Sequence, residues 1–473
     1  MGPAMSAIPS RVQQASVFRS RRGAELFLLI LALAVGIGAY AAVGLGVDGH
    51  VPPDILGYGG WLAALVIAAH ITIRFVAPYA DPVLLPVVAA LNGLGLAVIH
   101  RIDLAKGDTD FAAKQLFWMS VGVGLFIATL VFLSDHRALQ RFTYTCGLAA
   151  VVLLLLPLAP GLGTEINGAR IWIHLGGLSF QPGEVAKVLL VISFAGYLVL
   201  HRDALALAGR RVGGIDLPRG RDLGPILAMW LVSLLVLVAQ RDLGSGLLFF
   251  GLFLVMLYVA TERPGWLFVG GILFVAGVAA TYFLSGTIGF LTHVRNRFDI
   301  WLNPMEYYDR RPGSFQLVEG LFGMSWGGLI GRGFGEGRPT RVPYAESDFI
   351  MASIGEELGL TAVLAVILLY GLIVERGLRI ALISRDSFGK LMATGLAALL
   401  GLQVFTVIGG VTRLIPLTGL TTPFLSYGGS SLVANWVIVA LLLRISDHAR
   451  RPLPDLSVPD DQDQLNTQVV KLP

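Results

Sequence analysis

Charged residues and cysteine are scarce in this sequence. Asp, Glu, Lys and Arg make up 14% of the 473 residues, whereas soluble domains carry about 25%. The single cysteine, Cys146, excludes an internal disulfide and argues against a cysteine-ligated metal cluster. The net charge of +4 is small and the basic residues gather in loops, so we expect no nucleic-acid partner. No short apolar segment with a cleavage site follows residues 1–22, so the first apolar segment is expected to stay as an anchor.

Long apolar segments, by contrast, recur along the whole chain. Hydrophobic residues make up 55% of the sequence, and apolar segments of about 20 residues predict transmembrane helices. The fold expected is an all-α polytopic membrane protein with about twelve spans, in which two N-terminal spans precede a block of ten. The candidate spans are 26–43, 58–76, 83–99, 115–133, 143–158, 184–200, 224–237, 244–259, 265–284, 349–374, 391–409 and 431–445.

The distribution of basic loops predicts the orientation in the membrane. Basic loops after spans four, six, ten and twelve fall on the same side as the N-terminus, and the positive-inside rule makes that side cytoplasmic. A large loop, 287–347, is then external, as is a smaller one with Arg101 and Lys106 that departs from the rule. The predicted parts are a cytoplasmic N-terminal segment (1–22), two additional spans (23–82), a ten-span membrane domain (83–446) and a disordered cytoplasmic tail (447–473).

Three acids, Asp348, Glu356 and Glu357, lie at the start of the tenth span. Placing a carboxylate within a membrane span costs about 2.5–3.5 kcal/mol of insertion free energy. These acids are therefore expected to have a structural or functional role. If the segment is helical from residue 348, Asp348 and Glu356 lie about 80° apart around the axis, while Glu357 faces nearly the opposite way. The pair could then face one cavity, with Glu357 needing a partner of its own; the alternative is that all three pair with bases from other spans.

Further polar residues fall near external span ends. Glu184 and Lys187 are i, i+3 neighbours at the start of the sixth span and can form an ion pair. Lys187 can alternatively meet a phosphate at the external interface, where the free amides of a helix N-terminus also favour an anion. Arg170 and Trp172 belong to NGARIWIHLGG, which is either a short strand or an interfacial amphipathic segment. Trp172 is equally explained as an aromatic membrane anchor.

Two loops have unusual compositions. Residues 323–337 contain seven glycines in fifteen residues, which favours either a close approach of the backbone to a ligand or a flexible lid. The Lys-Ser/Thr ending of a nucleotide-binding P-loop is missing. Residues 416–431, PLTGLTTPFLSYGGSS, precede the last span, and irregular backbone at that depth must be buried or line a wet cavity. Arg295 and Arg297 either bind phosphate or mark the membrane interface.

Seven stretches together resemble the SEDS family (shape, elongation, division and sporulation), which includes RodA, FtsW and SpoVE. They occur in family order between about residues 83 and 446, and the two leading spans look like those of the actinobacterial RodA branch. The stretches are NGARIWI, FQPGEVAK, QRDLGSG, GSFQ with the glycine run after it, SDFIMASIGEELG, RDSFGK and PLTGLTTPFLSYGGSSL.

The resemblance implies site residues. Asp348 takes the place of the family's essential aspartate and is the expected catalytic residue. Glu346 stands where the family often has His and Tyr344 where it often has Glu, so neither is given a family role, and Arg241 stands where Pro is common. The candidate substrate-binding residues are Lys187, Glu184, Trp172, Arg170, Arg295, Arg297, Gln316, Glu356, Ser426 and Ser430, with Asp242 and Glu357 as structural or site-adjacent acids and no metal ligand assigned.

The resemblance also implies a function. The chain is expected to be a peptidoglycan glycosyltransferase that polymerises lipid II into β-1,4-linked glycan on the outer face of the cytoplasmic membrane, in elongation or division, and releases undecaprenyl diphosphate. The expected partners are lipid II, the undecaprenyl-linked glycan, membrane lipid and a class B penicillin-binding protein. Whether a divalent cation, Mg²⁺ or Mn²⁺, takes part stays open. The alternatives are a lipid II flippase and a non-catalytic scaffold.

Overall fold

The computed structural model describes residues 20–107, 109–166, 169–175, 178–202, 210–212, 215–217, 220–285, 292–310 and 313–452. Most of the predicted N-terminal segment and tail therefore lies outside the described residues. The long helices are α1 (Arg22–Val47), α2 (Ile55–Val76), α3 (Leu84–Lys106), α4 (Phe111–Phe132), α5 (Thr143–Leu155), α6 (Pro182–Leu200), α8 (Gly220–Ala239), α9 (Leu243–Thr261), α10 (Gly265–Leu284), α13 (Ile350–Ile383), α14 (Ser387–Val411) and α15 (Gly429–Arg450).

Shorter elements connect these helices. They are η1 (His136–Phe142), η2 (Leu156–Leu158), β1 (Gly163–Ile166), β2 (Ala169–Leu175), β3 (Leu178–Phe180), β4 (Arg210–Val212), β5 (Ile215–Leu217), α11 (Thr292–Leu302), η4 (Pro304–Tyr307), α12 (Phe315–Gly327) and η5 (Pro339–Arg341). Strands β1, β2 and β3 form one antiparallel sheet, and β4 and β5 form another. The segment around Trp172 is thus a strand, one of its two predicted forms.

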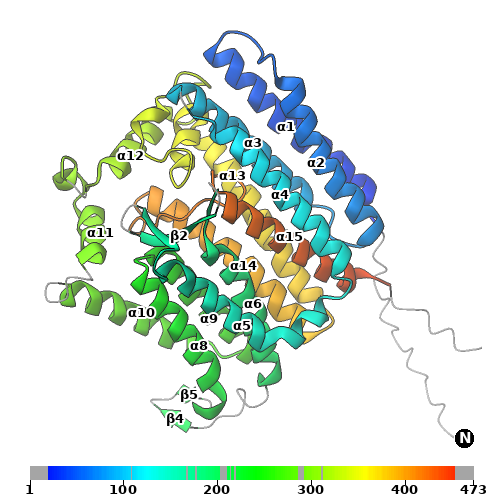
Figure 1. The fold of residues 1–473 in the computed structure, drawn as a ribbon, viewed down its shortest axis with the longest axis vertical. Coiled ribbons are helices and arrows are strands. Elements are labelled where there is room, and N and C mark those ends of the chain that lie inside the picture. The colour runs from blue at the N-terminus through cyan, green and yellow to red at the C-terminus, as the bar shows by residue number, and fades with distance from the viewer. Residues whose placement is uncertain are drawn as a thin grey trace, which may run out of the picture.

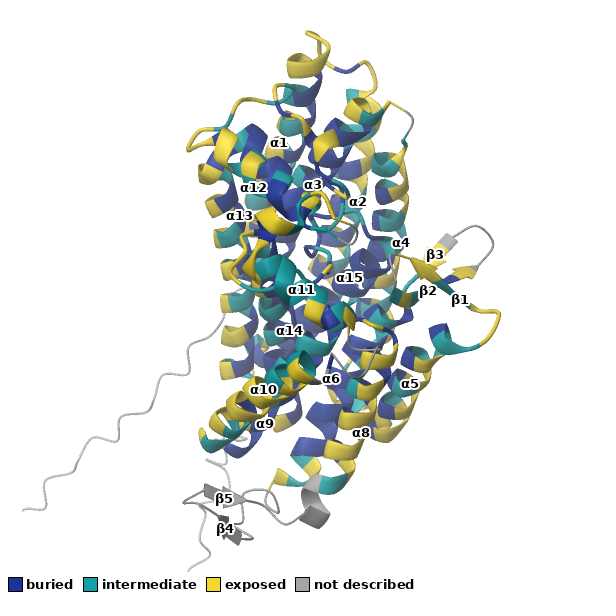
Figure 2. Cartoon of the chain, turned by 90° about the vertical axis from the view of Figure 1, so that its left-hand side faces the viewer, coloured by how far each residue is buried: buried dark blue, intermediate teal, exposed yellow. Residues whose placement is uncertain are grey.

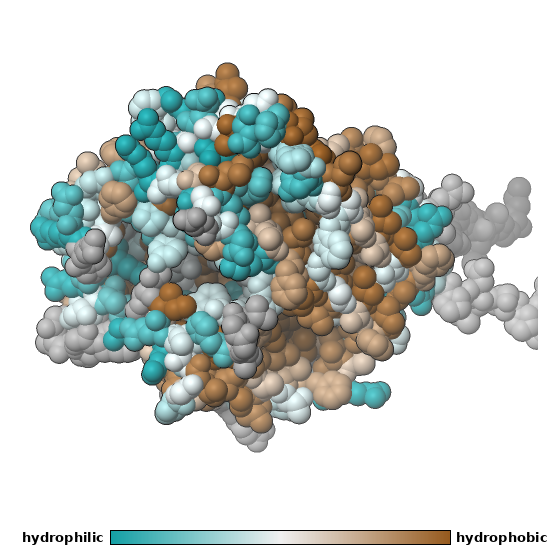
Figure 3. Space-filling model, turned by 45° about the horizontal axis from the view of Figure 1, so that its top comes forward, coloured by the Kyte–Doolittle hydropathy of each residue, from teal (hydrophilic) through white to brown (hydrophobic). Residues whose placement is uncertain are grey.

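The long helices form one membrane bundle. Within the described residues, eleven helical segments are long and apolar enough to span a membrane, and α8 adds a shorter apolar segment, Gly224–Ala239. This confirms the predicted all-α polytopic fold of about twelve spans. Helices α3, α6, α14 and α15 are mostly buried, whereas α10 has hardly any buried residues (Figure 2). Hydrophilic residues gather on the left of Figure 3 and apolar residues over its centre and right, as expected of a chain partly surrounded by lipid.

The two additional helices, α1 and α2, pack against the ten-span block (Figure 1). A Cβ placed on Gly36 would lie 2.8 Å from the Cα of Gly93, so α1 and α3 approach backbone to backbone. Near the other end of α1, the carboxylate of Glu25 lies 2.7 Å from Nδ1 of His70 in α2 and also pairs with Arg22. Small residues and buried charge pairs therefore hold this extension in place.

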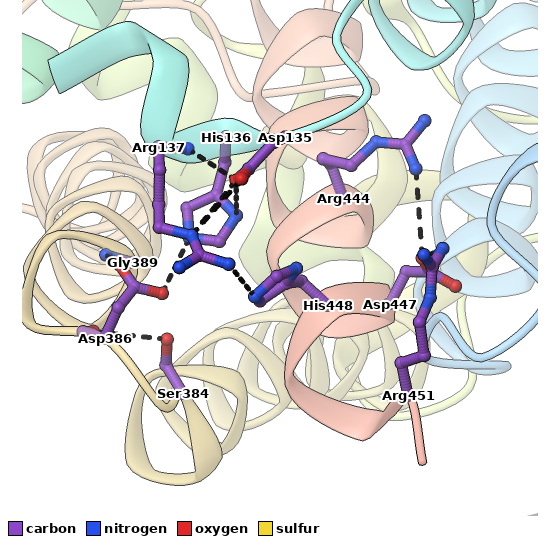
Figure 4. A network of polar contacts seen from close by, with 10 residues as sticks. All are labelled: Asp135, His136, Arg137, Ser384, Asp386, Gly389, Arg444, Asp447, His448 and Arg451. Carbon is purple, nitrogen blue, oxygen red and sulfur yellow. Dashed lines mark hydrogen bonds and ion pairs between the residues drawn. The ribbon is translucent and has the colours of Figure 1, made fainter. Parts of the chain in front are cut away.

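Three loops that the sequence predicts on one side do meet at one end of the bundle (Figure 4). Nε2 of His136, after α4, lies 2.9 Å from the carboxylate of Asp386, after α13. Nη2 of Arg137 lies 2.6 Å from Nε2 of His448 in α15. The basic loops after spans four, ten and twelve are thus joined directly to one another.

The glycine-rich loop at the opposite end lies against another backbone segment of the chain. It packs on α13, where Gly359 has φ 77° and interrupts the helix. The amide of Gly333 donates to the carbonyl of Glu357 (2.8 Å), and the amide of Leu360 donates to that of Gly328 (2.9 Å). A Cβ on Gly331 would lie 2.3 Å from the Glu357 carbonyl oxygen. The glycines therefore serve a close approach between two backbone segments.

Candidate functional site

Asp348 lies in the turn before α13, and α11, α12 and β2 lie near one another on the left of Figure 1. Oδ1 of Asp348 accepts hydrogen bonds from Ser347 Oγ (3.2 Å) and from Gln316 Nε2 (3.4 Å). Gln316 also donates to the carbonyl of Pro343 (2.9 Å), which fixes the amide beside the carboxylate. Ser426 Oγ donates to the Ser347 carbonyl (2.5 Å), so the irregular segment before α15 supports this turn.

The surroundings of Asp348 raise the pKa of its carboxyl group. Burial raises the pKa of Asp348 to about 6, against an ordinary value of 3.8, while hydrogen bonds and the positive charge of Arg297 oppose the rise. A general base is most effective when its pKa lies near the working pH. The carboxylate is therefore ionised at pH 7 yet more basic than a solvated aspartate.

A polar pocket lies beside this turn. Its volume is about 280 Å³, and Gln316 is among the residues that line it. Arg297 of α11 also lines the pocket, donates to the Leu417 carbonyl (2.6 Å) and lies in the field of Asp242 and Asp348. None of the described residues that line the pocket is acidic. The complete lining is Ala169, Arg241, His293, Asn296, Arg297, Ile300, Trp301, Gly313, Ser314, Gln316, Leu317 and Leu417.

An apolar groove of about 340 Å³ adjoins α11 on its other flank, against α10. Its lining, which is almost entirely apolar, is Phe274, Val275, Val278, Ala279, Tyr282, Phe298 and Leu302. Because residues of α11 line both spaces, a cationic pocket and an apolar groove are separated by one short helix. This arrangement suits an amphiphile with an anionic head.

The three acids of this region take different partners. Asp348 precedes α13, so the condition under which it and Glu356 would share a helix face is not met, and the Glu356 carboxylate accepts the backbone amide of Arg338 (2.9 Å). Glu357 does have its own partner, because its Oε1 lies 2.8 Å from Nε of Arg101. Arg101 also donates to the carbonyls of Gly335 and Gly337 (3.1 and 3.0 Å). Glu356 and Glu357 therefore organise the glycine-rich loop.

Lys187 and Glu184 form the predicted ion pair, with Nζ and Oε2 2.5 Å apart. The Lys187 ammonium also donates to Oε1 of Gln403 (2.9 Å), whose amide donates to the Thr421 carbonyl (2.8 Å). Only 2% of Lys187 is exposed. The structure therefore favours the ion-pair interpretation of Lys187 over direct contact with a phosphate.

Replacing Lys187 with Met is expected to lower stability by about 2 kcal/mol, because it leaves the buried Glu184 unpaired. The loss stays below that of a fully buried pair, since Glu184 lies in the first turn of α6, where the helix dipole favours a carboxylate. Adding Glu184→Gln should recover most of the stability. Thermal unfolding of the single and double variants measures this. A K187M protein that melts like wild type but has lost lipid binding would instead support the phosphate role.

Other candidates from the sequence lie around the site. Arg170 is exposed on β2, and its amide donates to the Gln240 carbonyl (3.1 Å), while Trp172 is half-buried. Arg295 is not among the residues that line the polar pocket, and its Nε lies 3.7 Å from the carboxylate of Asp299. Ser430 Oγ accepts the Gln181 amide (2.9 Å) at the start of α6.

Asp242 begins α9, its Oδ1 accepting the Ser245 amide (3.0 Å). Burial raises the pKa of Asp242, and Arg297 opposes this. The acid is thus a helix cap beside the pocket.

Some partners could not be identified from the sequence. Lys106 pairs with Glu346 (2.7 Å), and the Glu346 carbonyl accepts the Tyr427 amide (2.7 Å). Lys106 and Arg101, which depart from the positive-inside rule, thus each neutralise an acid. One feature of the sequence could have pointed to Gln403 as a buried polar partner. It is a lone amide side chain in the long apolar helix α14.

Within the described part of the chain, no three His, Cys, Asp or Glu side chains gather in a group that could hold a metal ion. The acids near the pocket are already engaged by protein donors. The side chains in the described part of the chain therefore do not fit a cation held by the protein alone.

The fold defines a polytopic membrane protein with a polar site at one end of its bundle. The chain belongs to the family of cell cycle proteins named for FtsW, RodA and SpoVE, whose model matches residues 82–451. It is 48% identical over 440 residues to a "Peptidoglycan glycosyltransferase RodA" of Mycobacterium tuberculosis, covering 92% of each chain. It is 32% identical to a "Probable peptidoglycan glycosyltransferase FtsW" of Geobacter metallireducens, covering 77% of this chain and 94% of that one.

Solved structures agree with this assignment. One, reported under "Structural coordination of polymerization and crosslinking by a peptidoglycan synthase complex", has a TM-score of 0.61 at 28% identity and covers 79% of this chain and 99% of its own. A Thermus thermophilus RodA with an aspartate-to-alanine substitution has a TM-score of 0.54 at 26% identity, with the same coverage. The resemblance read from the motifs is confirmed.

Proposed function

We propose that Asp348 is the general base with which this chain, a peptidoglycan glycosyltransferase, extends a lipid-linked glycan. The observation that carries the proposal is a carboxylate with a raised pKa beside a cationic pocket and an apolar groove. Lipid II is an undecaprenyl diphosphate bearing a disaccharide-pentapeptide. Its sugar hydroxyl suits the carboxylate, its diphosphate suits the cationic pocket, and its prenyl chain suits the apolar groove.

In the proposed reaction, Asp348 takes the proton from the 4-hydroxyl of the acceptor GlcNAc. The oxygen attacks C1 of the lipid-linked MurNAc and forms a β-1,4 bond, while the bond from C1 to the diphosphate oxygen breaks. Undecaprenyl diphosphate leaves with the bonding electrons. Direct inversion needs one carboxylate base and no glycosyl-enzyme intermediate. Arg297 would offset the charge that develops on the diphosphate.

The apolar groove between α10 and α11 would hold the start of the prenyl chain. Ring and aliphatic side chains line it, and α10 leaves it open at the side of the bundle. The diphosphate would then reach Arg297 across α11. Gln316 would hold the Asp348 carboxylate toward the acceptor hydroxyl.

This chemistry requires the site to face outward from the cytoplasmic membrane. The charge distribution of the loops supports that orientation, with both termini inside. A reporter that works only outside the cytosol is expected to be active when inserted near residue 345. A reporter that works only in the cytosol is expected to be active when fused after residue 452. Cytosolic activity at residue 345 would contradict the orientation and, with it, the proposed reaction.

The direct test is polymerisation of lipid II by the purified protein, measured as glycan strands. A lipid II flippase, the alternative class, would move lipid between leaflets of a vesicle without making polymer. The raised pKa of Asp348 beside a cationic pocket, at one end of the bundle, favours the enzyme. A class B penicillin-binding protein is the proposed partner, supported by the similar synthase complex, and the higher identity to RodA supports a role in elongation.

A further inference from the structure

The turn that joins α8 to α9 carries an arginine in a conformation that favours glycine. Arg241 has φ 60°, in the left-handed region where a Cβ crowds the neighbouring carbonyl. Its amide donates to the Val238 carbonyl (3.0 Å), and the amide of Asp242 donates to that of Leu237 (3.0 Å). These two bonds make a Schellman motif, in which the left-handed position is usually glycine. The backbone geometry therefore does not explain why an arginine stands there.

The side chain of Arg241 explains the choice, because it lines the polar pocket together with Arg297. The two guanidinium groups come from different elements, the α8–α9 turn and α11, and Asn296 and Gln316 contribute further amides. The described lining contains two positive charges and no acid, and of the two arginines Arg297 is also acted on by Asp242 and Asp348, which stand outside the lining. The lining therefore selects for an anionic ligand.

The acids nearest Arg241 leave its charge available. Glu165 of β1 lies 3.9 Å from Nη1, and its side chain is 59% exposed, so the pair is weak and screened by solvent. The carboxylate of Asp242 is directed to the Ser245 amide at the start of α9. Arg241 itself is half-exposed, so it can reach a ligand that enters the pocket from outside.

We propose that Arg241 is a second phosphate-binding arginine, which holds the diphosphate of the lipid-linked substrate opposite Arg297. The inference rests on the proposed function for the identity of the substrate. A guanidinium binds phosphate oxygens in a planar, two-pronged geometry, and a diphosphate offers two phosphate groups to two arginines. The left-handed turn places the Arg241 side chain on the pocket.

The test is equilibrium binding of undecaprenyl diphosphate, which carries no sugar and cannot be turned over, to the purified full-length protein (the parent) in micelles. Arg241→Gly is the informative variant, because glycine suits φ 60° while the cation is removed. We expect about tenfold weaker binding with an unchanged or higher melting temperature. Arg241→Lys should lose less affinity, since it keeps the charge. Glu165→Gln should bind as tightly as the parent or more so.

The matched control is Arg310→Gln, which removes an exposed external arginine that pairs with Glu306 and does not line the pocket. It should bind like the parent. Inorganic diphosphate should compete for the parent site and compete less well in Arg241→Gly, which distinguishes the headgroup from the prenyl chain. Parent-like binding by Arg241→Gly, or equal losses in Arg241→Gly and Glu165→Gln, would overturn the proposal, the second by showing that Arg241 merely anchors the β1–β2 hairpin.

The outcome is separable from that of the proposed reaction. Weak binding by Arg241→Gly together with full polymerisation by Asp348→Asn would sustain the arginine and remove the base. Strong binding by Arg241→Gly together with an inactive Asp348→Asn would support Asp348 as the base and contradict the role of Arg241.

Discussion

Purified protein carrying Asp348→Asn is expected to form at least a hundredfold less glycan from lipid II than wild type. Asparagine keeps the size of the side chain and the bond from Gln316, but it cannot accept a proton. Asp348→Glu serves as the matched variant, because it keeps the base but displaces it. Near-normal polymer from Asp348→Asn would remove Asp348 from the chemistry, whatever the effect of the other variant.

The pH dependence follows from the same carboxylate. Because burial raises the pKa of Asp348 to about 6, the polymerisation rate should fall about tenfold per pH unit below pH 6 and level off above it. The stability of the fold should change with pH in the opposite direction to the polymerisation rate. The folded-state pKa lies above the unfolded value, so the fold binds the proton more tightly and unfolding free energy decreases as pH rises from about 4 to about 6. Asp348→Asn, which is always neutral, should melt higher than wild type at pH 7.

Opposite signs for activity and stability would distinguish a functional acid from a structural one. A structural carboxylate held by ion pairs has a lowered pKa and loses stability when it is neutralised. An Asp348→Asn protein that is both inactive and much less stable would point to a defect of folding.

Local patterns predicted the elements well and the contacts poorly. Apolar length is enough to place a span, because only a helix satisfies its own backbone in lipid. Helical spacing likewise predicted the pair of Glu184 and Lys187. The packing partner of the glycine run could not be predicted, because its glycines approach the backbone of α13, a segment some 30 residues further along the chain. Short-range patterns carry no information about such a partner.

Charge partners across the bundle were also beyond the sequence. Arg101 and Lys106 looked like exceptions to a rule of topology, yet each neutralises an acid more than 200 residues away. The conformation of Arg241 was hidden too, since nothing in Gln-Arg-Asp signals a left-handed residue. Only the packed bundle shows which polar side chains bind other parts of the protein and which are available to bind a substrate.

Breaking the pair of Arg101 and Glu357 should cause the largest loss of stability among these variants. Arg101→Met leaves the buried Glu357 carboxylate without its cation and removes the donors to Gly335 and Gly337. Loss of one partner of a buried pair typically costs about 3–5 kcal/mol. Thermal unfolding in detergent should show a lower melting temperature, and the double variant Arg101→Met, Glu357→Met should recover part of the loss.

The same substitution should loosen the glycine-rich loop before the bundle melts. Arg101 holds two loop carbonyls, and on the other side the loop contacts α1, where a Cβ on Gly46 would lie 1.9 Å from the Phe334 carbonyl oxygen. Hydrogen exchange in residues 328–338 should therefore accelerate in Arg101→Met at temperatures where α14 stays protected. Unchanged exchange there would show that α1 and the interrupted α13 hold the loop without the arginine, and the pair would then stabilise only the contact between α3 and α13.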